Sequence, residues 1–574
     1  MLVFSSSLKL IPLKRTILFF IALLFLSTII LTAQTYARNG MVASANKVSS
    51  QTGIDILKKG GNAIDAAVAT AFSLAVTHPR AGNIGGGGFM VFMKEDGDVT
   101  TIDFREKAPL ASTPNMFLGE DGKVKDNSNH DSLLAVGVPG TVAGLYKAHR
   151  KYGKLPWKDV VQPAVDQAEN GFEFIWSLYF HGQSYKEVEN AEKYPFMASY
   201  FNNENGEVTE PGTLWKQPAL ANTLKQIRDN GRDGFYKGKV AKTIEKYMKE
   251  NGGIITTEDL EKYEAIERKP VKGTYKGYDI YSMSPPSSGG VTLIQMMNTM
   301  ELVDWENIEF NSAEYVHVVA EAMRRGFADR AEHLGDPDFN PDMPIDRLMS
   351  KVHAKNRFDN LDMERASVSD STKYGHPYDG KNTTHFSVLD KDGNAVSLTY
   401  TLEHTYGVKM GSPELGFIFN NEMGDFNAVP GVTNSRGQIG SKPNLIAPEK
   451  RMLSSMTPTI VAKDGKPYLV IGSPGGRTII NTVFQATLNV LEFDMRIDKA
   501  IEAMKIHHQW LPNFLVYESE KLSPDTRKKL EAMGHVMYPR ATLGVLMGIT
   551  WDPESKIMIG AADTVRPDGG AIGY

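Results

Sequence analysis

The sequence predicts a layered protein that contains both helices and strands, of the α/β or α+β class. Helical patterns prevail between residues 140 and 380, whereas short apolar strands prevail after residue 383. The expected strands span residues 384–389, 395–401, 416–420, 457–463, 467–472 and 546–551, with helices near 476–492 and 497–505. Sheets made of such strands need helices on their outer faces to bury apolar residues, which predicts a layered architecture.

Composition narrows the possible functions. The chain has 574 residues, of which 41% are hydrophobic and 23% are charged, as in a globular protein with an ample core. A net charge of −5 gives no basis for a nucleic-acid partner. The absence of cysteine excludes disulfides, thiol nucleophiles and cysteine-ligated zinc. The acidic cluster at residues 336–342 lacks the ligand spacing of a calcium loop, so we predict no metal site.

The first 37 residues have the pattern of a secretory signal peptide. Lys9, Lys14 and Arg15 precede an apolar run over residues 17–31, and small residues then lead to Ala37. We therefore expect a periplasmic or secreted protein, with cleavage after residue 37. An uncleaved membrane anchor is the alternative, because the apolar run approaches the length that spans a bilayer.

The next segment predicts packing rather than ligand binding. Residues 43–79 predict two helices separated by Gly60-Gly61, and a glycine run at residues 85–88 then leads into a strand. A phosphate-binding loop needs a helix after its glycines. Close packing of backbones is therefore the better interpretation of this run.

Residues 383–401 predict a hairpin of two strands around an Asp-Gly turn. If Asp392 is the centre of an odd-length turn, Thr383 faces Thr401, whereas a turn of two or four residues would shift this register by one. A threonine hydroxyl needs a base to act as a nucleophile. In a chain that begins at threonine the α-amino group can serve, because its pKa lies near neutrality. Taken alone, Thr383 and Thr384 are better explained as strand formers, and it is the motifs farther along the chain that favour a nucleophile.

Three further motifs carry groups suited to an acyl substrate. The turn Gly475-Gly476 follows an apolar strand and can present backbone N–H groups to an oxyanion. Glu422 and Asp425 are three residues apart and can converge on one cation. The segment Asp103-Phe104-Arg105-Glu106 carries an arginine whose fork can engage both oxygens of a carboxylate, although taken alone it indicates a surface salt bridge.

The segment Asn382-Thr383-Thr384-His385-Phe386-Ser387, with the strand that follows Asp392-Gly393, resembles the processing site of the γ-glutamyltranspeptidases. These are N-terminal-nucleophile hydrolases, and the resemblance extends over roughly residues 40–574. It implies an α+β fold, a four-layer αββα sandwich built from two autoprocessed subunits that form a heterodimer. The large subunit would span residues 38–382 and the small one residues 383–574, or 574 − 382 = 192 residues. The resemblance implies no metal or organic cofactor.

The resemblance also implies roles for individual residues. Thr383 would be the nucleophile, Thr401 would orient it, and Gly475 and Gly476 would stabilise the oxyanion. The α-carboxylate of a glutamyl moiety would be held by Arg105, Ser454 and Ser455. Its α-amino group would be held by Glu403, Glu422 and Asp425. The implied activity is transfer of the γ-glutamyl group of glutathione or a related compound to water, an amino acid or a dipeptide.

Two departures from the family pattern leave the balance of hydrolysis and transfer open. Met452 replaces a usual proline, and Arg436 is the nearest counterpart of an aromatic residue that often shields the site. Three alternatives also stay open at this point. They are a β-lactam acylase of the same superfamily, a poly-γ-glutamate depolymerase, and an exported γ-glutamyl-binding protein without catalysis.

Overall fold

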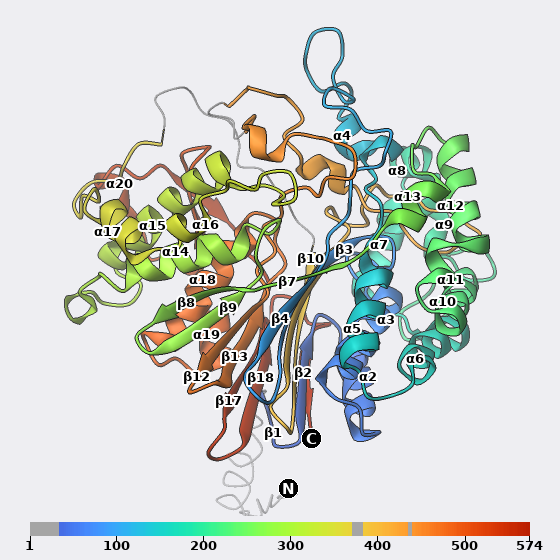
Figure 1. Ribbon diagram of the computed structural model, residues 1–574, viewed down its shortest axis with the longest axis horizontal. Helices are drawn as coiled ribbons and strands as arrows, with labels where there is room; N and C mark the ends of the chain where they lie inside the picture. Colours follow the sequence, from blue (N-terminus) through green and yellow to red (C-terminus); the bar gives the residue numbers. More distant parts are fainter. Residues whose placement is uncertain (1–33, 370–382, 434–438) are drawn as a thin grey trace, which may run out of the picture.

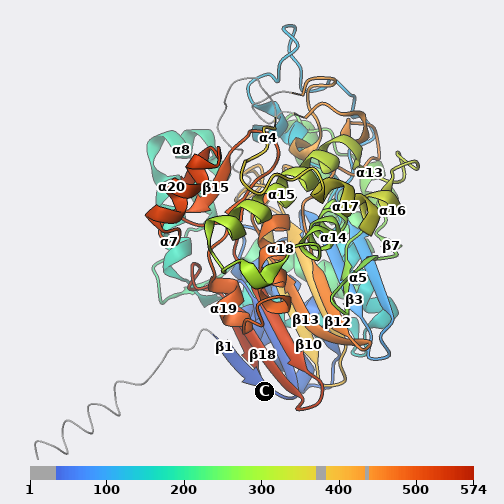
Figure 2. The same cartoon turned by 90° about the vertical axis from the view of Figure 1, so that its left-hand side faces the viewer.

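The computed structural model describes residues 34–369, 383–433 and 439–574. Two seven-stranded sheets stack face to face between layers of helices (Figure 1). In a view turned by 90°, α14, α18 and α19 lie in front of the strands of one sheet (Figure 2). The predicted four-layer αββα sandwich is confirmed.

Both large sheets are antiparallel throughout. The first sheet contains, in spatial order, β1 (Gln34–Ala37), β18 (Ile557–Ala562), β17 (Met547–Asp552), β13 (Lys466–Gly472), β12 (Thr459–Lys463), β9 (Tyr278–Ser282) and β8 (Val271–Tyr275). The second contains β19 (Gly570–Gly573), β2 (Gly40–Ser44), β10 (Thr383–Asp390), β11 (Ala395–Thr401), β3 (Gly87–Met93), β4 (Val99–Phe104) and β7 (Ile266–Arg268). Two smaller sheets contain β5 (Phe172–Glu173) and β6 (Leu214–Trp215), and β14 (Ile506–His507), β15 (Leu515–Glu518) and β16 (Met537–Arg540).

Helices cover the outer face of each large sheet. On the second sheet lie α2 (Lys47–Lys58), α3 (Ala63–Thr77) and α5 (Thr141–Tyr152), with α6 (Trp157–Asn170), α10 (Pro218–Asn230) and α12 (Gly238–Glu250) beyond them. On the first lie α14 (Gly289–Met300), α18 (Thr478–Leu491) and α19 (Ile497–Glu502), and α15 (Ala313–His333) packs against α14. Shorter helices are α4 (Ser128–Asp131), α7 (Trp176–Lys186), α8 (Val188–Lys193), α9 (Pro195–Tyr200), α11 (Asp233–Tyr236), α13 (Thr257–Lys262), α16 (Ile345–Leu348), α17 (Lys351–Phe358) and α20 (Pro524–Ala532).

Side chains that alternate along the strands of the second sheet contribute to two hydrophobic cores, one on each face of the sheet. Leu389 of β10 and Val91 of β3 belong to the cluster between the sheets, where Val470 of β13 also lies. Their neighbours Val388 and Phe92 belong instead to the cluster beneath the helices. Because successive strand residues point to opposite faces, both faces of these central strands are apolar and buried.

The predicted pair of helices before residue 79 is confirmed. Gly60, with φ of +94°, follows the end of α2, and Asn62 begins α3 by a capping box with Asp65. The glycine run packs closely, as expected: a Cβ atom on Gly86 would lie 2.0 Å from the carbonyl oxygen of Thr401. These backbones could not approach so closely if that position carried a side chain.

The predicted strand at residues 416–420 is wrong. This segment contributes an isolated bridge between Gly411 and Ile418 and no extended ladder. Left-handed backbone at Tyr406, Gly407 and Lys409 bends the facing segment, so consecutive residues cannot pair. The apolar pattern that suggested a strand reflects burial of Phe417 and its neighbours.

The N-terminal strand β1 includes residues that the sequence assigned to the leader. Gln34–Ala37 pairs with β18, and the Thr35 hydroxyl donates a hydrogen bond to the carbonyl of Ala571 at 2.8 Å. Among the described residues, none of the helices is both long and apolar enough to span a membrane. The apolar run at residues 17–31 lies outside the described residues.

Candidate active site

The hairpin β10–β11 brings two hydroxyl groups together. Thr383 and Thr401 are directly opposite in the antiparallel register, as the odd-length turn predicts. The Thr383 hydroxyl donates to Oγ1 of Thr401 at 3.4 Å, and both side chains are buried. Thr401 is fixed in turn by the backbone N–H of Glu403, which donates to its Oγ1 at 2.8 Å.

Most of the predicted site residues line one cavity. Besides Thr383 and Thr401, its lining consists of Arg105, Glu403, Glu422, Asp425, Ser454, Ser455, Met456, Gly476, Arg477 and Ile479. Gly475 precedes this lining, while Asn382 and Arg436 lie outside the described residues. The structure thus gathers residues from the segment that follows β4, the hairpin, η3 (Glu422–Asp425) and the turn before α18 around the two threonines.

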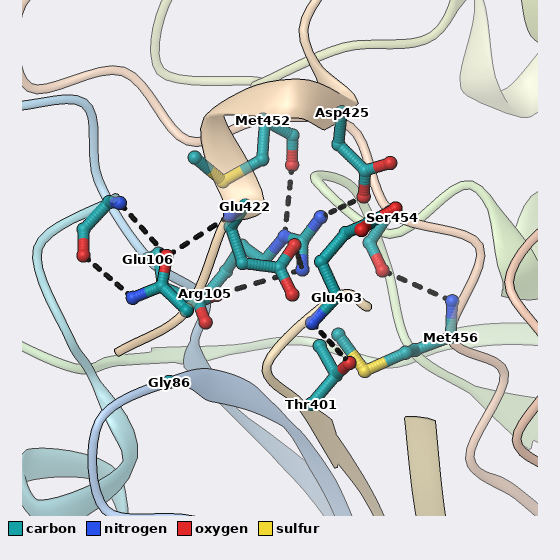
Figure 3. Close-up of polar contacts among 12 residues, drawn as sticks. Gly86, Arg105, Glu106, Thr401, Glu403, Glu422, Asp425, Met452, Ser454 and Met456 are labelled. Carbon is teal, nitrogen blue, oxygen red and sulfur yellow. Dashed lines mark hydrogen bonds and ion pairs between the residues drawn. The ribbon is translucent and has the colours of Figure 1, made fainter. Parts of the chain in front are cut away.

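Arg105, which contributes to the lining of this cavity, is surrounded by carboxylates (Figure 3). Its guanidinium lies 2.5 Å from Glu422, 2.5 Å from Asp425 and 3.6 Å from Glu106. Its Nε also donates to the carbonyl of Met452 at 3.3 Å. Arg105, Glu106 and Glu422 are at most 1% exposed, whereas the side chain of Asp425 is 32% exposed and faces the opening of the cluster to water.

One arginine does not neutralise three carboxyl groups. Burial raises the pKa of Glu106 to about 8, although Arg105 opposes this shift. Burial likewise raises the pKa of Glu422 well above its usual value and raises that of Asp425. Burial disfavours the charged form of a carboxyl group. The cluster therefore retains at least one proton near neutral pH and is suited to accept a further cation.

A histidine orients the fourth carboxylate. The Nε2 of His404 lies 2.8 Å from an oxygen of Glu403, whose backbone has φ of +74°. The Asn421 amide is 3.0 Å from Nδ1 of His404, and the ring of His130 stacks on His404 with centroids 4.7 Å apart. Burial lowers the pKa of His404, but the Glu403 carboxylate more than offsets it, so this pKa is raised.

The two serines face the cavity from the strand-like segment after Met452. Oγ of Ser454 accepts a hydrogen bond from the N–H of Met456 at 3.1 Å, and Oγ of Ser455 accepts one from Arg330 at 3.0 Å. The carbonyl of Ser454 accepts from the N–H of Ser288 at 2.9 Å. These bonds hold both hydroxyls beside Arg105, where together they can bind a carboxylate.

The glycine turn adopts backbone conformations that L side chains rarely take. The φ values are +139° at Gly475 and +58° at Gly476, and a Cβ atom on Gly475 would lie 2.4 Å from Thr478. The turn follows β13 and begins α18, as the sequence predicts. Its N–H groups lie at a helix N-terminus, a position that favours developing negative charge.

Two groups of side chains in the described part of the chain have metal-like spacing. They are His130, Glu403 and His404, and His317, Glu321 and His535. In the first group, the Asn421 amide donates to Nδ1 of His404, which leaves the ring proton on Nε2, pointing at Glu403. That nitrogen then has no lone pair for a cation, so the geometry is that of a hydrogen-bond chain.

Sequence reasoning missed four residues at or beside the cavity. They are His130, His404, Arg330 and Arg477. His404 and Arg477 immediately follow the predicted residues Glu403 and Gly476, so adjacency is a signal that would have found them. Arg330 on α15 and His130 on α4 are brought in by tertiary packing alone.

Comparison with known proteins agrees with this arrangement. The sequence model of the family described as Gamma-glutamyltranspeptidase matches residues 49–574. The glutathione hydrolase proenzyme of Escherichia coli strain K12 is 45% identical over 548 residues, covering 94% of this chain and 92% of that protein. The crystal structure of Helicobacter pylori γ-glutamyltranspeptidase matches with a TM-score of 0.53 and 46% identity, covering 55% of this chain and 90% of that one. That of the cephalosporin acylase from Bacillus halodurans has a TM-score of 0.81 and 25% identity, covering 94% and 97%. The chain therefore belongs to the γ-glutamyltranspeptidase family of enzymes.

Proposed function

We propose that this protein is an exported γ-glutamyltranspeptidase and glutathione hydrolase that activates itself by cutting between Asn382 and Thr383. The observation that carries the proposal is one cavity in which a paired threonine lies beside an arginine–serine site and a carboxylate cluster. Such a cavity suits a nucleophile next to the carboxylate and ammonium of an amino-acid head group. Similarity to the Escherichia coli glutathione hydrolase proenzyme supports the substrate.

Self-cleavage would use the same hydroxyl as catalysis. Oγ1 of Thr383 attacks the carbonyl carbon of Asn382, and the Thr383 nitrogen leaves, so the peptide bond becomes an ester. Water then hydrolyses the ester, which restores the hydroxyl and leaves a free α-amino group on Thr383. That amino group supplies the base that the hydroxyl previously lacked.

Turnover would proceed through a γ-glutamyl ester. Oγ1 of Thr383 attacks the γ-amide carbon while the α-amino group takes the hydroxyl proton and passes it to the leaving amine. Thr401 orients the nucleophile, and the N–H groups of Gly475 and Gly476 stabilise the oxyanion. Water or the amine of an amino acid or dipeptide then takes the acyl group and frees the hydroxyl.

The head group would be held by exchange of the resting ion pairs. Its α-carboxylate would bind Arg105, Ser454 and Ser455, while its ammonium would bind Glu403, Glu422 and Asp425. Arg105 now pairs with Glu422 and Asp425, so a zwitterion can replace both halves of that pairing. A substrate without the ammonium would leave the carboxylates unsatisfied, which favours selectivity for γ-glutamyl compounds.

Similarity to the structure of a cephalosporin acylase makes a β-lactam acylase the second candidate function. The ammonium site argues against it, because a dicarboxylic acyl chain offers no cation to the carboxylates around Arg105. A poly-γ-glutamate depolymerase would use the same head-group contacts and is separated by assay with the polymer.

The test is release of the amine from a chromogenic γ-glutamyl anilide, with and without glycylglycine. We expect the purified protein to migrate as a large and a small chain and to release the amine. Thr383→Ala should remain a single chain and be inactive. Thr384→Val is the matched control, because the buried Thr384 hydroxyl makes no hydrogen bond within the described residues. A processed wild-type protein that releases nothing would overturn the assignment, and absence of acceleration by glycylglycine would identify chiefly a hydrolase.

A further inference from the structure

A second cluster of basic side chains lies where the end of α3 meets α7 and the segment before β19. His78 ends α3, and Arg80 follows it two residues later. His181 comes from α7, and Arg566 from the segment before β19. The charges of both arginines act on both histidine rings, so the four side chains lie close to one another. None of the four belongs to the lining of the active-site cavity.

Hydrogen bonds between distant segments hold this cluster together. The carbonyl of Arg80 accepts from the N–H of Tyr406 at 3.0 Å, and the Tyr406 hydroxyl lies 2.6 Å from Nδ1 of His181. One helical turn earlier on α7, the Ser177 hydroxyl donates to Asp568 at 2.6 Å. Residues four apart share one face of a helix. This face of α7 therefore contacts both Tyr406 and the segment before β19.

Two buried nitrogen atoms of the cluster have no hydrogen-bond partner among the residues that the structure describes. They are Nη1 of Arg566 and Nε2 of His78, and His78 is only 4% exposed. The two carboxylates whose charges favour Arg566 are engaged elsewhere. Asp563 pairs with Lys505 at 3.1 Å, and Asp568 accepts from α7. Buried polar groups are nearly always hydrogen-bonded, so these two nitrogens indicate a partner that is not part of the polypeptide.

The charge of the cluster shows what kind of partner this is. Burial, followed by the charge of Arg80, lowers the pKa of Arg566 to about 9, although two neighbouring aspartates oppose this shift. Burial and then the same two arginines lower the pKa of His181 to about 4 and that of His78 well below its usual value. Both rings are therefore neutral near pH 7, and the positive charge is that of the arginines. An anion between these groups would stabilise both cations.

We propose that Arg566 and His78, supported by the charge of Arg80, bind a small monovalent anion of the size of chloride. Nη1 of Arg566 would donate to the anion, as would Nε2 of His78 in the tautomer that carries its proton there. Both arginines are partly exposed, so a small ion can reach the cluster from solvent. Through Arg80 the anion would also stabilise the backbone at Tyr406, where φ is +60°. This site is independent of the proposed function, and its expected effect is on the stability of the fold.

The experiment compares thermal unfolding of the purified protein in sodium chloride and in sodium gluconate, at equal ionic strength and one heating rate. Gluconate is too large for a site of this kind. We expect the apparent midpoint of the wild-type protein to be higher in chloride by about 2 °C, with an effect that saturates as chloride is added. In Arg566→Gln this difference should disappear. In gluconate the variant should unfold no earlier than the wild-type protein, because its repulsion with Arg80 is removed.

Arg496→Gln is the matched control. Asp498 holds that arginine at 2.6 Å, so its loss should shift the midpoint equally in both salts. Crystals soaked in sodium bromide should show anomalous density beside Nη1 of Arg566 in the wild-type protein and none there in Arg566→Gln. Equal wild-type midpoints in chloride and gluconate would overturn the site, even if bromide were seen, because the ion would then be adventitious. Neither measurement uses γ-glutamyl chemistry, so failure of the proposed function would leave this result unaffected.

Discussion

At the scale of single residues, the protonation of the carboxyl groups around Arg105 would control binding at the proposed head-group site. Glu106, Glu422 and Asp425 share Arg105, and burial raises the pKa of each carboxyl group. A substrate ammonium would take the place of a proton held by this cluster. Binding would therefore release a proton to solvent, in addition to exchanging ion pairs.

This linkage predicts that donor affinity rises with pH. The carboxyl groups stay protonated up to their raised pKa, about 8 for Glu106, so KM for the anilide should fall from pH 6 to pH 8. The fall can reach about tenfold per pH unit when one proton must leave. Steady-state kinetics over this range provides the measurement.

Glu106→Gln offers the control for that prediction. Its KM should depend less on pH, because one titrating group is removed. The raised pKa of Glu106 also stabilises the fold fully below about 4.5, and this contribution is lost as pH rises through about 8. Parallel KM profiles for the wild-type and Glu106→Gln enzymes would contradict the assignment of the released proton to Glu106.

Gly424 makes the stacked histidine pair possible. A Cβ atom at this position would lie 2.1 Å from Cε1 of His130, so the ring could not keep its present position against His404. We expect Gly424→Ala to lower the free energy of unfolding by about 1–3 kcal/mol. It should also raise KM, because His130 stacks on His404. Thermal or denaturant unfolding tests the first effect, and Gly119→Ala, whose nearest atom would be 3.3 Å away, should be nearly neutral.

At the scale of elements, local pattern was sufficient where a segment folds on itself. The strands β10 and β11 were predictable because an Asp-Gly turn lies between two apolar segments, although their register depended on the turn having an odd length. The turn before α18 was predictable from its glycine pair after an apolar strand. The edge strands β1 and β19 were not, because their pairing partners lie far away in the sequence. The segment 416–420 was wrongly predicted as a strand because an apolar run indicates burial but not backbone hydrogen bonding.

The site residues also divide into those that local sequence motifs predict and those that only the packing of distant segments brings in. Arg105, Glu422 and Ser454 were predicted through resemblance to family motifs, and the structure brings them together. Arg330 was not predicted, since an arginine on a long helix has no local signal that distinguishes a cavity from solvent. Its role depends on how α15 packs against the segment that carries Ser455.

The strand β1 predicts where the leader ends. Cleavage after residue 37 would remove Gln34–Ala37 and leave β18 as an unpaired edge. We therefore expect the mature chain to begin at or before Gln34, which mass spectrometry of the exported protein would measure. A mature N-terminus at Arg38 would retain the boundary predicted from sequence and show that β1 is dispensable.

At the scale of the whole molecule, the two predicted subunits are interleaved. The hairpin β10–β11 of the small subunit lies between β2 and β3 of the large one, with backbone pairing on both sides. In the first sheet, β12 of the small subunit also pairs with β9 of the large one. Neither subunit retains a complete sheet without the other.

We predict that the processed chains cannot be separated by dilution. They should co-elute in gel filtration at every concentration in native buffer and separate in denaturant, since separation would expose several strands at once. Analysis of the eluted fractions on a denaturing gel is the measurement. A small chain that elutes by itself in native buffer would contradict this account.

The position of that hairpin also makes refolding differ between the precursor and the processed enzyme. In the precursor, both flanks of β10 and β11 belong to one polymer, so the sheet assembles by an intramolecular search. Once residue 382 is released from residue 383, a denatured enzyme would have to insert a hairpin from one polymer between two strands of another. Heat inactivation of the processed enzyme should therefore be irreversible. The lifetime of the mature enzyme is then governed by its rate of unfolding.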